Sequence, residues 1–565
     1  MSLPQAMSQL SGTVTIGTGG MYSTIGAALN EINAYGLSGH VIFELEAGVY
    51  NESIYLSNIT DLTKDSTLTF RSTDGPSAAI IRSLNNNPTN ALVSLINCPF
   101  ITFDGIRFVI EQQNIWFVEA TGCHNFELNN CTFSEPLLSS TSFGNAGLVS
   151  VTESNHVYID STEIPRRLYV NNDTLVVVTD SEIRRGHYSQ SSITHTVFAS
   201  NCDSLYISNS IISEYSIGGH AQTAEIINCD VAGIGLPGNA PQSGILIKDN
   251  YVQGFIRINT GKVINNTVTN PHASSACIWI NNGDSCIVDR NVVYPRMEKG
   301  IYAPIGSGLI TNNMVLDTWD NTYVFDRNGI DVAGDFYVSH NSVFMNNVTV
   351  DNEAAGIKIL GDSEVVINNI VYIEHPIATS LNVTTGNTFT SENNILMNAS
   401  GPLASMLGTL FYTLQQWNAS SSQDNLSIAI SPSFIGHDDL HLTSSSGILL
   451  AGYSDSVVYD IDSEVRQVTT HVGADQVFNV SLFNENKSSL QLFPNPTNDY
   501  FFIDGLVDNG TETTIKIYKI TGEEVERIED YDTNTPILLP YKGIYIVRID
   551  QGTGEEIILK VSRPY

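Results

Sequence analysis

A six-residue motif dominates the chain: an apolar residue, any residue, a turn-forming or polar residue, two further residues and a second apolar residue. It recurs thirteen times, and only Ser391 departs from the apolar first position. The third positions run from Gly105 to Asn393, with spacings of 16 to 31 residues that average about 24. A fixed motif with elastic spacing indicates coils whose strands are constant and whose loops vary. The copies begin at Phe103, Leu128, Ile159, Val178, Ile207, Ile226, Ile247, Val263, Val288, Ile310, Val338, Val366 and Ser391.

Period-two alternation and an excess of β-branched residues favour strands over helices. Coils of about 22–25 residues with three short strands predict an all-β fold, a right-handed parallel β-helix of thirteen or more coils. An open end of such a solenoid exposes a sheet edge. Residues 23–35 place Ile25, Ala28, Leu29 and Ile32 on one helical face, which predicts an N-terminal cap helix.

Asparagine occupies the third or fourth motif position in many copies. Asparagine tolerates the left-handed backbone region and can hydrogen-bond to its equivalents in adjacent coils, so we expect an asparagine ladder. Cys98, Cys123 and Cys202 each lie seven residues before a third motif position. We expect them to be buried thiols at equivalent inward sites, with a metal ladder as the remote alternative.

Composition narrows the function. The 565 residues carry a net charge of −34, with 25 Lys plus Arg against 59 Asp plus Glu. A field of that sign repels phosphate backbones, which excludes nucleic acid as a partner. No apolar run is long enough to span a bilayer. The seven cysteines include no CxxC, so neither a disulfide framework nor a zinc ribbon is expected. We expect a monomer.

The first 60 residues contain Tyr22-Ser-Thr-Ile25, Ala27-Ala-Leu29, Val41-Ile-Phe-Glu-Leu45 and Ala47-Gly-Val-Tyr50 with Glu52. This segment resembles the opening of pectin-lyase-like β-helix proteins, and pectinesterases begin in a similar way. The resemblance extends loosely through the coils to about residue 475. Enzymes, adhesins and tailspikes share that fold, so the resemblance implies a fold and no single function.

Near residue 460 the chain reads Asp460-Ile-Asp-Ser-Glu-Val-Arg466, followed by Val472-Gly-Ala-Asp475. This is similar to the closing segment of secreted bacterial β-helix proteins. One interpretation is a structural closing coil with an Arg–Asp pair. The other is a calcium site formed by Asp460, Asp462 and Asp475, because hard cations favour clustered carboxylates.

From Leu490 the pattern becomes hairpin-rich. Phe493-Pro-Asn-Pro-Thr497, Ile515-Lys-Ile-Tyr518, Thr521-Gly522 and Gly543-Ile-Tyr-Ile-Val-Arg548 resemble the C-terminal sorting domain of type IX secretion cargo, although many members carry Tyr where Phe493 stands. The resemblance implies export, recognition by the type IX secretion machinery through 490–565, and a secreted or cell-surface location. We therefore divide the chain into a disordered or processed N-terminus (1–12), the β-helix (13–480), a linker (481–489) and a sorting β-sandwich (490–565).

Candidate chemistry centres on a repeat at 19 residues: Glu163-Ile-Pro-Arg166 and Glu182-Ile-Arg-Arg185. The two Glu should stack in neighbouring coils, as should the two Arg. A polysaccharide lyase needs a base and a cation that neutralises a uronate carboxylate. We predict Arg166, Arg185 and His187 as catalytic, and Glu163, Glu182 and Arg184 as substrate-binding. The alternative is a surface Glu–Arg ladder that supports the coil stack.

Other enzyme classes fit less well. A polygalacturonase-like hydrolase needs paired carboxylates between Asn172-Asp173 and Gly219-His220, and none is there. A pectinesterase has only the faint echo at Gly329-Ile-Asp-Val332. We expect a β-helix protein that binds or degrades an extended, acidic polysaccharide or cell-surface glycan, by a lyase reaction if it is an enzyme. The alternative is a non-catalytic adhesin. Extra residues in the intervals 130–161, 180–209 and 312–368 would wall a groove in an enzyme and be scattered in an adhesin.

Overall fold

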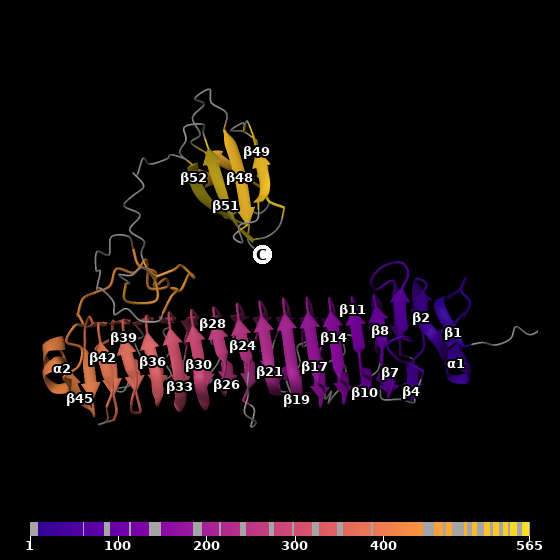
Figure 1. Ribbon diagram of the computed structural model, residues 1–565, viewed down its shortest axis with the longest axis horizontal. Coiled ribbons are helices and arrows are strands. Elements are labelled where there is room, and N and C mark those ends of the chain that lie inside the picture. The colour runs from indigo at the N-terminus through magenta and orange to yellow at the C-terminus, as the bar shows by residue number, and fades with distance from the viewer. Residues whose placement is uncertain are drawn as a thin grey trace, which may run out of the picture. The chain divides into compact units, whose positions relative to one another are not determined.

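The computed structural model divides into two compact units, Met1–Val477 and Phe478–Tyr565 (Figure 1). None of the described helices is long and apolar enough to cross a membrane. The structure describes residues 9–59, 61–83, 91–111, 115–134, 148–184, 195–213, 216–237, 244–269, 276–296, 299–318, 327–346, 354–385, 388–443, 457–466 and 471–476 of the first unit, and 491–493, 500–504, 513–519, 524–529, 531, 535–540, 543–550 and 556–563 of the second.

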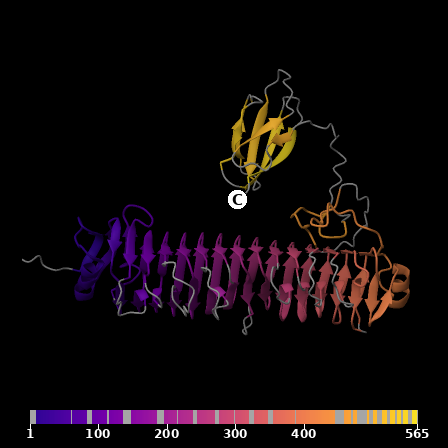
Figure 2. The ribbon, with the colours of Figure 1, turned by 180° about the vertical axis from the view of Figure 1, so that it is seen from behind.

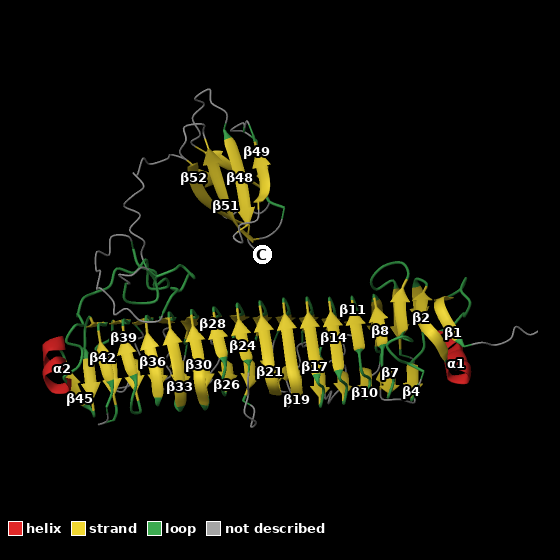
Figure 3. Ribbon diagram, viewed as in Figure 1, coloured by secondary structure: helices red, strands yellow, loops and turns green. Residues whose placement is uncertain are grey.

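The first unit is a parallel β-helix, as the sequence predicts. Its strands form three ladders, and each full coil adds one strand to each ladder (Figures 1 and 3). The first ladder contains β1 (Leu10–Ile16), β2 (Leu37–Leu45), β5 (Leu68–Ser72), β8 (Ile101–Asp104), β11 (Phe126–Asn129), β14 (His156–Asp160), β17 (Leu175–Thr179), β19 (His195–Ser208), β21 (Ser216–Ile227), β24 (Ile245–Lys248), β27 (Lys262–Ile264), β30 (Gly283–Asp289), β33 (Gly306–Thr311), β36 (Asp335–Ser339), β39 (Val365–Ile367) and β42 (Thr390–Glu392).

The second ladder is a 15-stranded sheet of its own. It contains β3 (Gly48–Tyr50), β6 (Ala79–Arg82), β9 (Ile106–Val109), β12 (Thr132–Ser134), β15 (Glu163–Ile164), β18 (Glu182–Ile183), β20 (Ile211–Ile212), β22 (Asp230–Val231), β25 (Tyr251–Val252), β28 (Thr267–Thr269), β31 (Val292–Tyr294), β34 (Met314–Asp317), β37 (Ser342–Met345), β40 (Ile370–Ile373) and β43 (Ile395–Asn398).

The third ladder shares the long strands β19 and β21 with the first, which joins the two ladders into one 30-stranded sheet. Its other strands are β4 (Ile54–Ser57), β7 (Ala91–Ile96), β10 (Trp116–Thr121), β13 (Leu148–Thr152), β16 (Arg167–Asn171), β23 (Ile234–Leu236), β26 (Ile256–Ile258), β29 (Ala276–Ile280), β32 (Lys299–Ala303), β35 (Asn328–Val332), β38 (Ala355–Ile359), β41 (Thr379–Val383), β44 (Ala404–Met406) and the antiparallel β45 (Thr409–Phe411).

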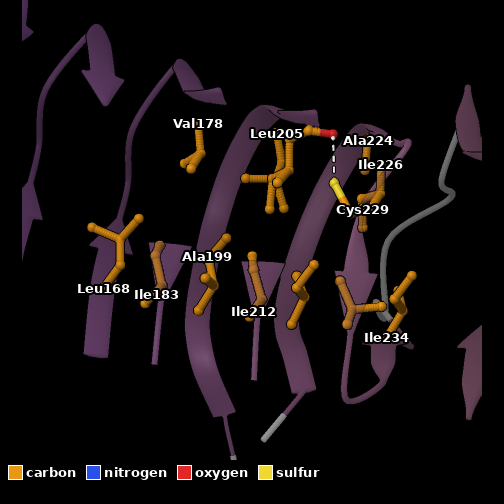
Figure 4. Packing of buried hydrophobic residues seen from close by; sticks show 14 of the residues in the cluster. Leu168, Val178, Ile183, Ala199, Leu205, Ile212, Ala224, Ile226, Cys229 and Ile234 are labelled. Atoms are coloured by element: carbon orange, nitrogen blue, oxygen red, sulfur yellow. Dashed lines mark hydrogen bonds between the residues drawn. The ribbon is translucent and has the colours of Figure 1, made fainter. Parts of the chain in front are cut away.

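A single apolar column fills the centre of the coils. Every second residue of a strand points inward, so equivalent residues of successive coils stack on one another. Phe70 and Phe103, for example, are register partners whose rings stack 4.9 Å apart. Leu168, Ala199 and Ile234 on the third ladder and Ile183 and Ile212 on the second extend the column (Figure 4). Cys98, Cys123 and Cys202 are buried free thiols, as expected.

The motif marks the corner between the first and second ladders, and its third and fourth positions have separate roles. All thirteen third positions have φ between 48° and 69°, in the left-handed region where Asn, Asp and Gly are favoured. The fourth positions point inward and form the predicted ladder, in which each Asn accepts a backbone N–H from the preceding coil. The ladder contains Asn250, Asn266, Asn291, Asn313, Asn341, Asn369 and Asn394.

Helices close both ends of the solenoid (Figures 2 and 3). The helix α1 (Ile25–Tyr35) buries Ile25, Ala28, Leu29 and Ile32, the face that the sequence predicts. The Glu52 carboxylate accepts the N–H groups of Ile25 and Gly26 at 3.0 and 2.7 Å, which satisfies the first turn. The strand β1 begins at Leu10, inside the segment 1–12 that we had set apart as disordered or processed.

At the other end, α2 (Leu414–Ser421) places the fully buried Trp417 against Phe411. The indole Nε1 donates to Asp424 Oδ2 at 2.8 Å. The last third-ladder pairing is antiparallel, which ends the stack.

After α2 the chain turns back and covers the outside of the second ladder. We call this segment the strap; its described residues are 424–443, 457–466 and 471–476. It packs on Met314, Leu316, Phe344, Ile370 and Ile395, all on second-ladder strands. The sequence predicted a closing coil at 460–475. The structure places these residues across the face of earlier coils, because the outward side chains there are apolar and need cover.

The second unit has two antiparallel sheets around a core of its own. One contains β46 (Gln491–Phe493), β47 (Tyr500–Asp504) and β50 (Ile537–Leu538); the other contains β48 (Thr514–Lys519), β49 (Glu524–Ile528), β51 (Gly543–Asp550) and β52 (Glu556–Arg563). Phe501, Ile517, Tyr545 and Val547 are buried between them. This is the small β-sandwich that the sequence predicts.

Candidate functional site

The long intervals of the repeat all add residues at one corner of the coil. The extra residues lie between β12 and β13, between β18 and β19, between β34 and β35, and between β37 and β38. Each of these connections leads from the second ladder into the third. Most of their residues lie outside the described ranges. Because all four join the second ladder to the third, they direct attention to the third ladder. The walled groove expected of an enzyme stays a prediction.

One outward position of the third ladder, followed over seven successive coils, carries four aromatic rings, one cation and two glycines. We call it the third-ladder row. Backbone pairing puts its members in register from β16 to β32, at a coil rise of about 4.8 Å. They are Tyr169, Phe198, Gly218, Gly235, Arg257, Trp279 and Tyr302.

The N-terminal part of the row is a stack on Phe198. The Tyr169 ring lies 5.8 Å away and the His195 imidazole 5.4 Å away, both nearly parallel to it. The Arg167 guanidinium carbon lies 5.0 Å from the centre of the same ring. Gly218 makes room for the imidazole, since a Cβ there would lie 2.2 Å from His195 Nδ1. His195, which can act as a base, and the cation Arg167 therefore pack against the same aromatic ring.

Burial and charge act on both groups of this stack. Burial, and then the neighbouring Arg167 charge, lower the pKa of His195 below its ordinary 6.5. The imidazole is therefore neutral near pH 7. Burial also lowers the pKa of Arg167. Because the ordinary pKa of a guanidinium is far above 7, Arg167 keeps its positive charge.

The C-terminal part of the row pairs cations with aromatic rings. The Phe255 ring lies over Gly235, where a Cβ would be 3.4 Å from it. The Arg257 guanidinium lies 4.0 Å from the Trp279 ring centre and donates to Asn281 Oδ1 at 3.4 Å. Lys299 Nζ lies 4.0 Å from the Tyr302 ring centre.

The same ammonium is 2.9 Å from Asp331 Oδ2 in the next coil. Arg167, Arg257 and Lys299 thus gather within seven coils of a chain whose net charge is −34. The rings of this row can stack on sugars, and the cations on and beside it can bind carboxylates.

Among the residues predicted from the 19-residue repeat, those that the structure describes lie on the second ladder or just after it. Glu163 and Glu182 are register partners on β15 and β18, so the expected glutamate stack is present. Glu182 forms an ion pair with the exposed Arg184. Arg166 is half-buried where the chain passes from β15 to β16. Arg185 and His187 lie outside the described residues, so their predicted roles stay predictions.

The three aspartates predicted for calcium meet on the strap, and each has a structural partner. Asp460 Oδ1 accepts the N–H groups of Asp462 and Glu464 at 3.1 and 2.9 Å. Asp475 Oδ2 accepts the Leu442 N–H at 2.7 Å. Over the described parts of the chain, no three His, Cys, Asp or Glu side chains are arranged to hold a metal ion. Calcium binding by Asp460, Asp462 and Asp475 stays a prediction.

Two other groups hold the strap in place. The Arg466 guanidinium donates to the carbonyls of Gly473 and Ala474, both at 2.9 Å, and to Asn312 Oδ1 at 2.6 Å. His441 lies between the carboxylates of Asp462 and Asp439, which raise its pKa to about 9 against the opposing effect of burial. These contacts give Arg466 a structural role, bonding backbone carbonyls and a corner asparagine.

Reasoning from the sequence missed His195, Arg257 and Lys299. Each lies in a third-ladder strand, where the motif gives no register, and single outward residues have no repeat to mark them. Trp279 was one of four tryptophans that the sequence did not distinguish. A sequence signal that could find such residues is a cationic or aromatic residue in the strand that follows each connection of variable length.

Comparison with known proteins identifies the second unit. Residues 491–561 match the family model described as a secretion system C-terminal sorting domain. The chain matches no curated protein. The protein is therefore an exported parallel β-helix protein, secreted or displayed at the cell surface, whose sorting domain is recognised by the secretion machinery.

Proposed function

We propose that this exported β-helix binds an extended acidic polysaccharide along the third-ladder row and cleaves it by a lyase reaction. The observation that supports the proposal is the third-ladder row, in which four aromatic rings and Arg257 lie in register, with Arg167 and Lys299 packed on its rings. Six steps of about 4.8 Å make the row about 30 Å long. Because the coil rise is close to the length of one pyranose unit, a sugar chain that runs along the solenoid axis places roughly one sugar over each coil.

The charge balance favours an acidic ligand. A strongly negative protein repels polyanions except where cations are concentrated. Arg257 in the row, and Arg167 and Lys299 beside it, lie against the row's aromatic rings, where partial burial strengthens their attraction for carboxylates. Uronate chains carry carboxylates that these cations can bind, whereas neutral chains carry none.

A lyase reaction fits the row better than hydrolysis. A glycoside hydrolase needs two carboxyl groups facing the scissile bond. Over the described residues from Tyr169 to Tyr302, the row itself carries no carboxylate, and Asp331 in the next coil is ion-paired with Lys299. Elimination requires a base and a carboxylate-neutralising cation, and His195 with Arg167 supplies both.

The test is equilibrium binding of polygalacturonate, alginate and dextran to the full chain. We expect the two polyuronates to bind, dextran to bind much more weakly, and affinity to fall as salt rises. Trp279→Ala and Arg257→Gln should each weaken polyuronate binding about tenfold, equivalent to about 1.4 kcal/mol. Tyr55→Ala, which removes an exposed ring from the same register on β4, is the matched control and should bind normally. Equal binding of dextran and polyuronates would contradict the proposal, and binding without cleavage would support the adhesin alternative.

A further inference from the structure

The outward position that forms the third-ladder row changes character after Tyr302. Its register continues through Asp331, Lys358, Asn382 and Ser405 on β35, β38, β41 and β44. The residues before and after each of the first three belong to the apolar column, so these polar side chains point outward as the rings before them do. The row of rings is thus followed by charged and amide side chains.

These outward polar side chains are buried. Asp331 is 0% exposed, Lys358 4% and Asn382 7%. Every residue of β35, β38 and β41 is buried, whereas β26, β29 and β32 each keep a half-buried residue in the row. Lysine and aspartate on an open sheet face reach solvent. Other parts of the chain therefore cover the outer face of the third ladder from β35 to β41.

An ion pair marks the boundary between the accessible and the covered part of this face. Lys299 Nζ lies 4.0 Å from the Tyr302 ring centre and 2.9 Å from Asp331 Oδ2. The Lys299 side chain is 14% exposed, and the Asp331 side chain is not exposed at all. A sugar chain that continued past Tyr302 would have to separate this pair, and removing one partner of a buried pair is costly. The row is therefore closed after Tyr302.

The opposite end of the row is open. The same register runs back from Tyr169 through Ser150, Glu119 and Ser94 to Tyr55. Glu119 is half-buried and Tyr55 is 51% exposed. The two serines are buried, but they are small and alternate with these larger side chains. A bound chain can therefore leave the row toward β4.

We infer that the third-ladder row binds the end of a polyuronate chain and not its interior. The inference rests on the proposed function and adds which part of the polymer the site takes. The terminal sugar packs on Tyr302 with Lys299 beside its carboxylate, and the following sugars lie over Trp279 and Arg257 toward β16. Each chain then offers one binding position, whatever its length. A row open at both ends would bind at many positions along every chain.

The first experiment measures how many full-length protein molecules bind one polygalacturonate chain at saturation. Light scattering gives this number for size fractions of the polymer that are all longer than the row. We expect one molecule per chain for every fraction. A number that grows in proportion to chain length overturns the inference and leaves the proposed function intact. Failure to bind any polygalacturonate overturns the proposed function itself.

Modified chain ends test the inference at the terminal sugar. One set of oligogalacturonates longer than the row has its reducing-end sugar reduced to the alditol, and a second set carries an unsaturated sugar at the non-reducing end. We expect one modification to weaken binding about tenfold or more and the other to leave it unchanged, because only one end lies at Tyr302. Equal effects of the two modifications, or no effect of either, overturn the inference.

Two ring variants locate the chain end within the row. In Tyr302→Ala, the penalty of the effective modification should shrink to about threefold or less, because the modified sugar has lost the ring on which it packs. Tyr169→Ala, at the opposite end of the row, is the matched control and should keep the full penalty. A penalty that stays full in Tyr302→Ala, or that shrinks equally in both variants, overturns the placement of the end at Tyr302. Unchanged melting temperatures show that both variants fold.

Discussion

The backbone N–H and the side-chain amide of Asn341 both donate to one oxygen, Asn369 Oδ1, at 3.0 Å each. The same Asn341 side chain donates to the Ile310 carbonyl of the preceding coil at 2.8 Å. Each ladder asparagine thus ties neighbouring coils together while fully buried. The ladder supplies partners for backbone groups that a tight corner would otherwise leave unpaired.

Asn341→Ala should lower the free energy of unfolding by about 2–4 kcal/mol, because it leaves buried donors and an acceptor without partners. The matched control is Asn265→Gly, at a third motif position with φ of 55°, where glycine is permitted. We expect the control to cost no more than about 1 kcal/mol. Chemical denaturation measures both, and equal losses at the two positions would contradict the separate roles of the third and fourth positions.

The Arg466 guanidinium fixes the strap through backbone carbonyls and Asn312. Arg466→Ala should therefore open the strap while the solenoid stays folded, since the coils have their own core. Hydrogen exchange at Leu440, Ile461 and Ala474 should quicken. Arg290→Ala, which removes one hydrogen bond to Ser463 and one guanidinium contact with the Tyr459 ring, is the control and should have a smaller effect. Exchange that quickens equally throughout the coils would show that the strap and solenoid unfold together.

Two titratable side chains, the buried Asp173 and the half-buried His441, make stability fall as pH rises. Burial raises the pKa of Asp173 from 3.8 to about 7, so the folded state binds a proton more tightly than the unfolded state. The contribution of Asp173 is complete below pH 3.8 and is lost as pH rises through 7. The pKa of His441 is raised from 6.5 to about 9, so its contribution is complete below pH 6.5 and lost as pH rises through 9.

Melting temperature measured against pH should therefore decline in two windows, about pH 4–7 and about pH 6.5–9. His441→Gln should flatten the upper window and leave the lower one. If the melting temperature of His441→Gln still declines between about pH 6.5 and 9, that decline does not come from His441.

The sorting domain should be necessary for export and unnecessary for folding of the solenoid. A chain that lacks residues 491–561 is expected to accumulate inside the cell envelope, with the melting behaviour of the β-helix retained. Cell fractionation and surface proteolysis measure this, with full-length Trp279→Ala as the exported control. Normal surface display of the truncated chain would refute the role of the domain.

The repeat predicted the coil architecture well, because the corner between the first and second ladders imposes the same backbone conformation thirteen times. The strap was missed because its signal lies in outward residues: Met314, Ile370 and Ile395 are apolar at a motif position that is polar or charged in Thr132, Glu163 and Asp230. The change from polar to apolar residues at this motif position marks the coils whose second-ladder strands are covered by the strap.

The sequence and the structure direct attention to different residues on neighbouring ladders. The 19-residue repeat drew attention to Arg166 and Glu163 on the second-ladder side. The row itself consists of single residues that come together only through third-ladder register, such as Arg257 and Trp279. Loop lengths vary from coil to coil, so that register cannot be read from spacing alone.

Hydrogen exchange with and without a saturating polygalacturonate oligosaccharide tests the central claim most directly. We predict slower exchange in third-ladder strands β16, β26, β29 and β32 and in the third-ladder part of β19, with no change in second-ladder strands such as β22 and β25. The same oligosaccharide should protect Trp279→Ala less and Tyr55→Ala fully. Protection confined to the first ladder or the strap, or no protection at a saturating concentration, would contradict the account.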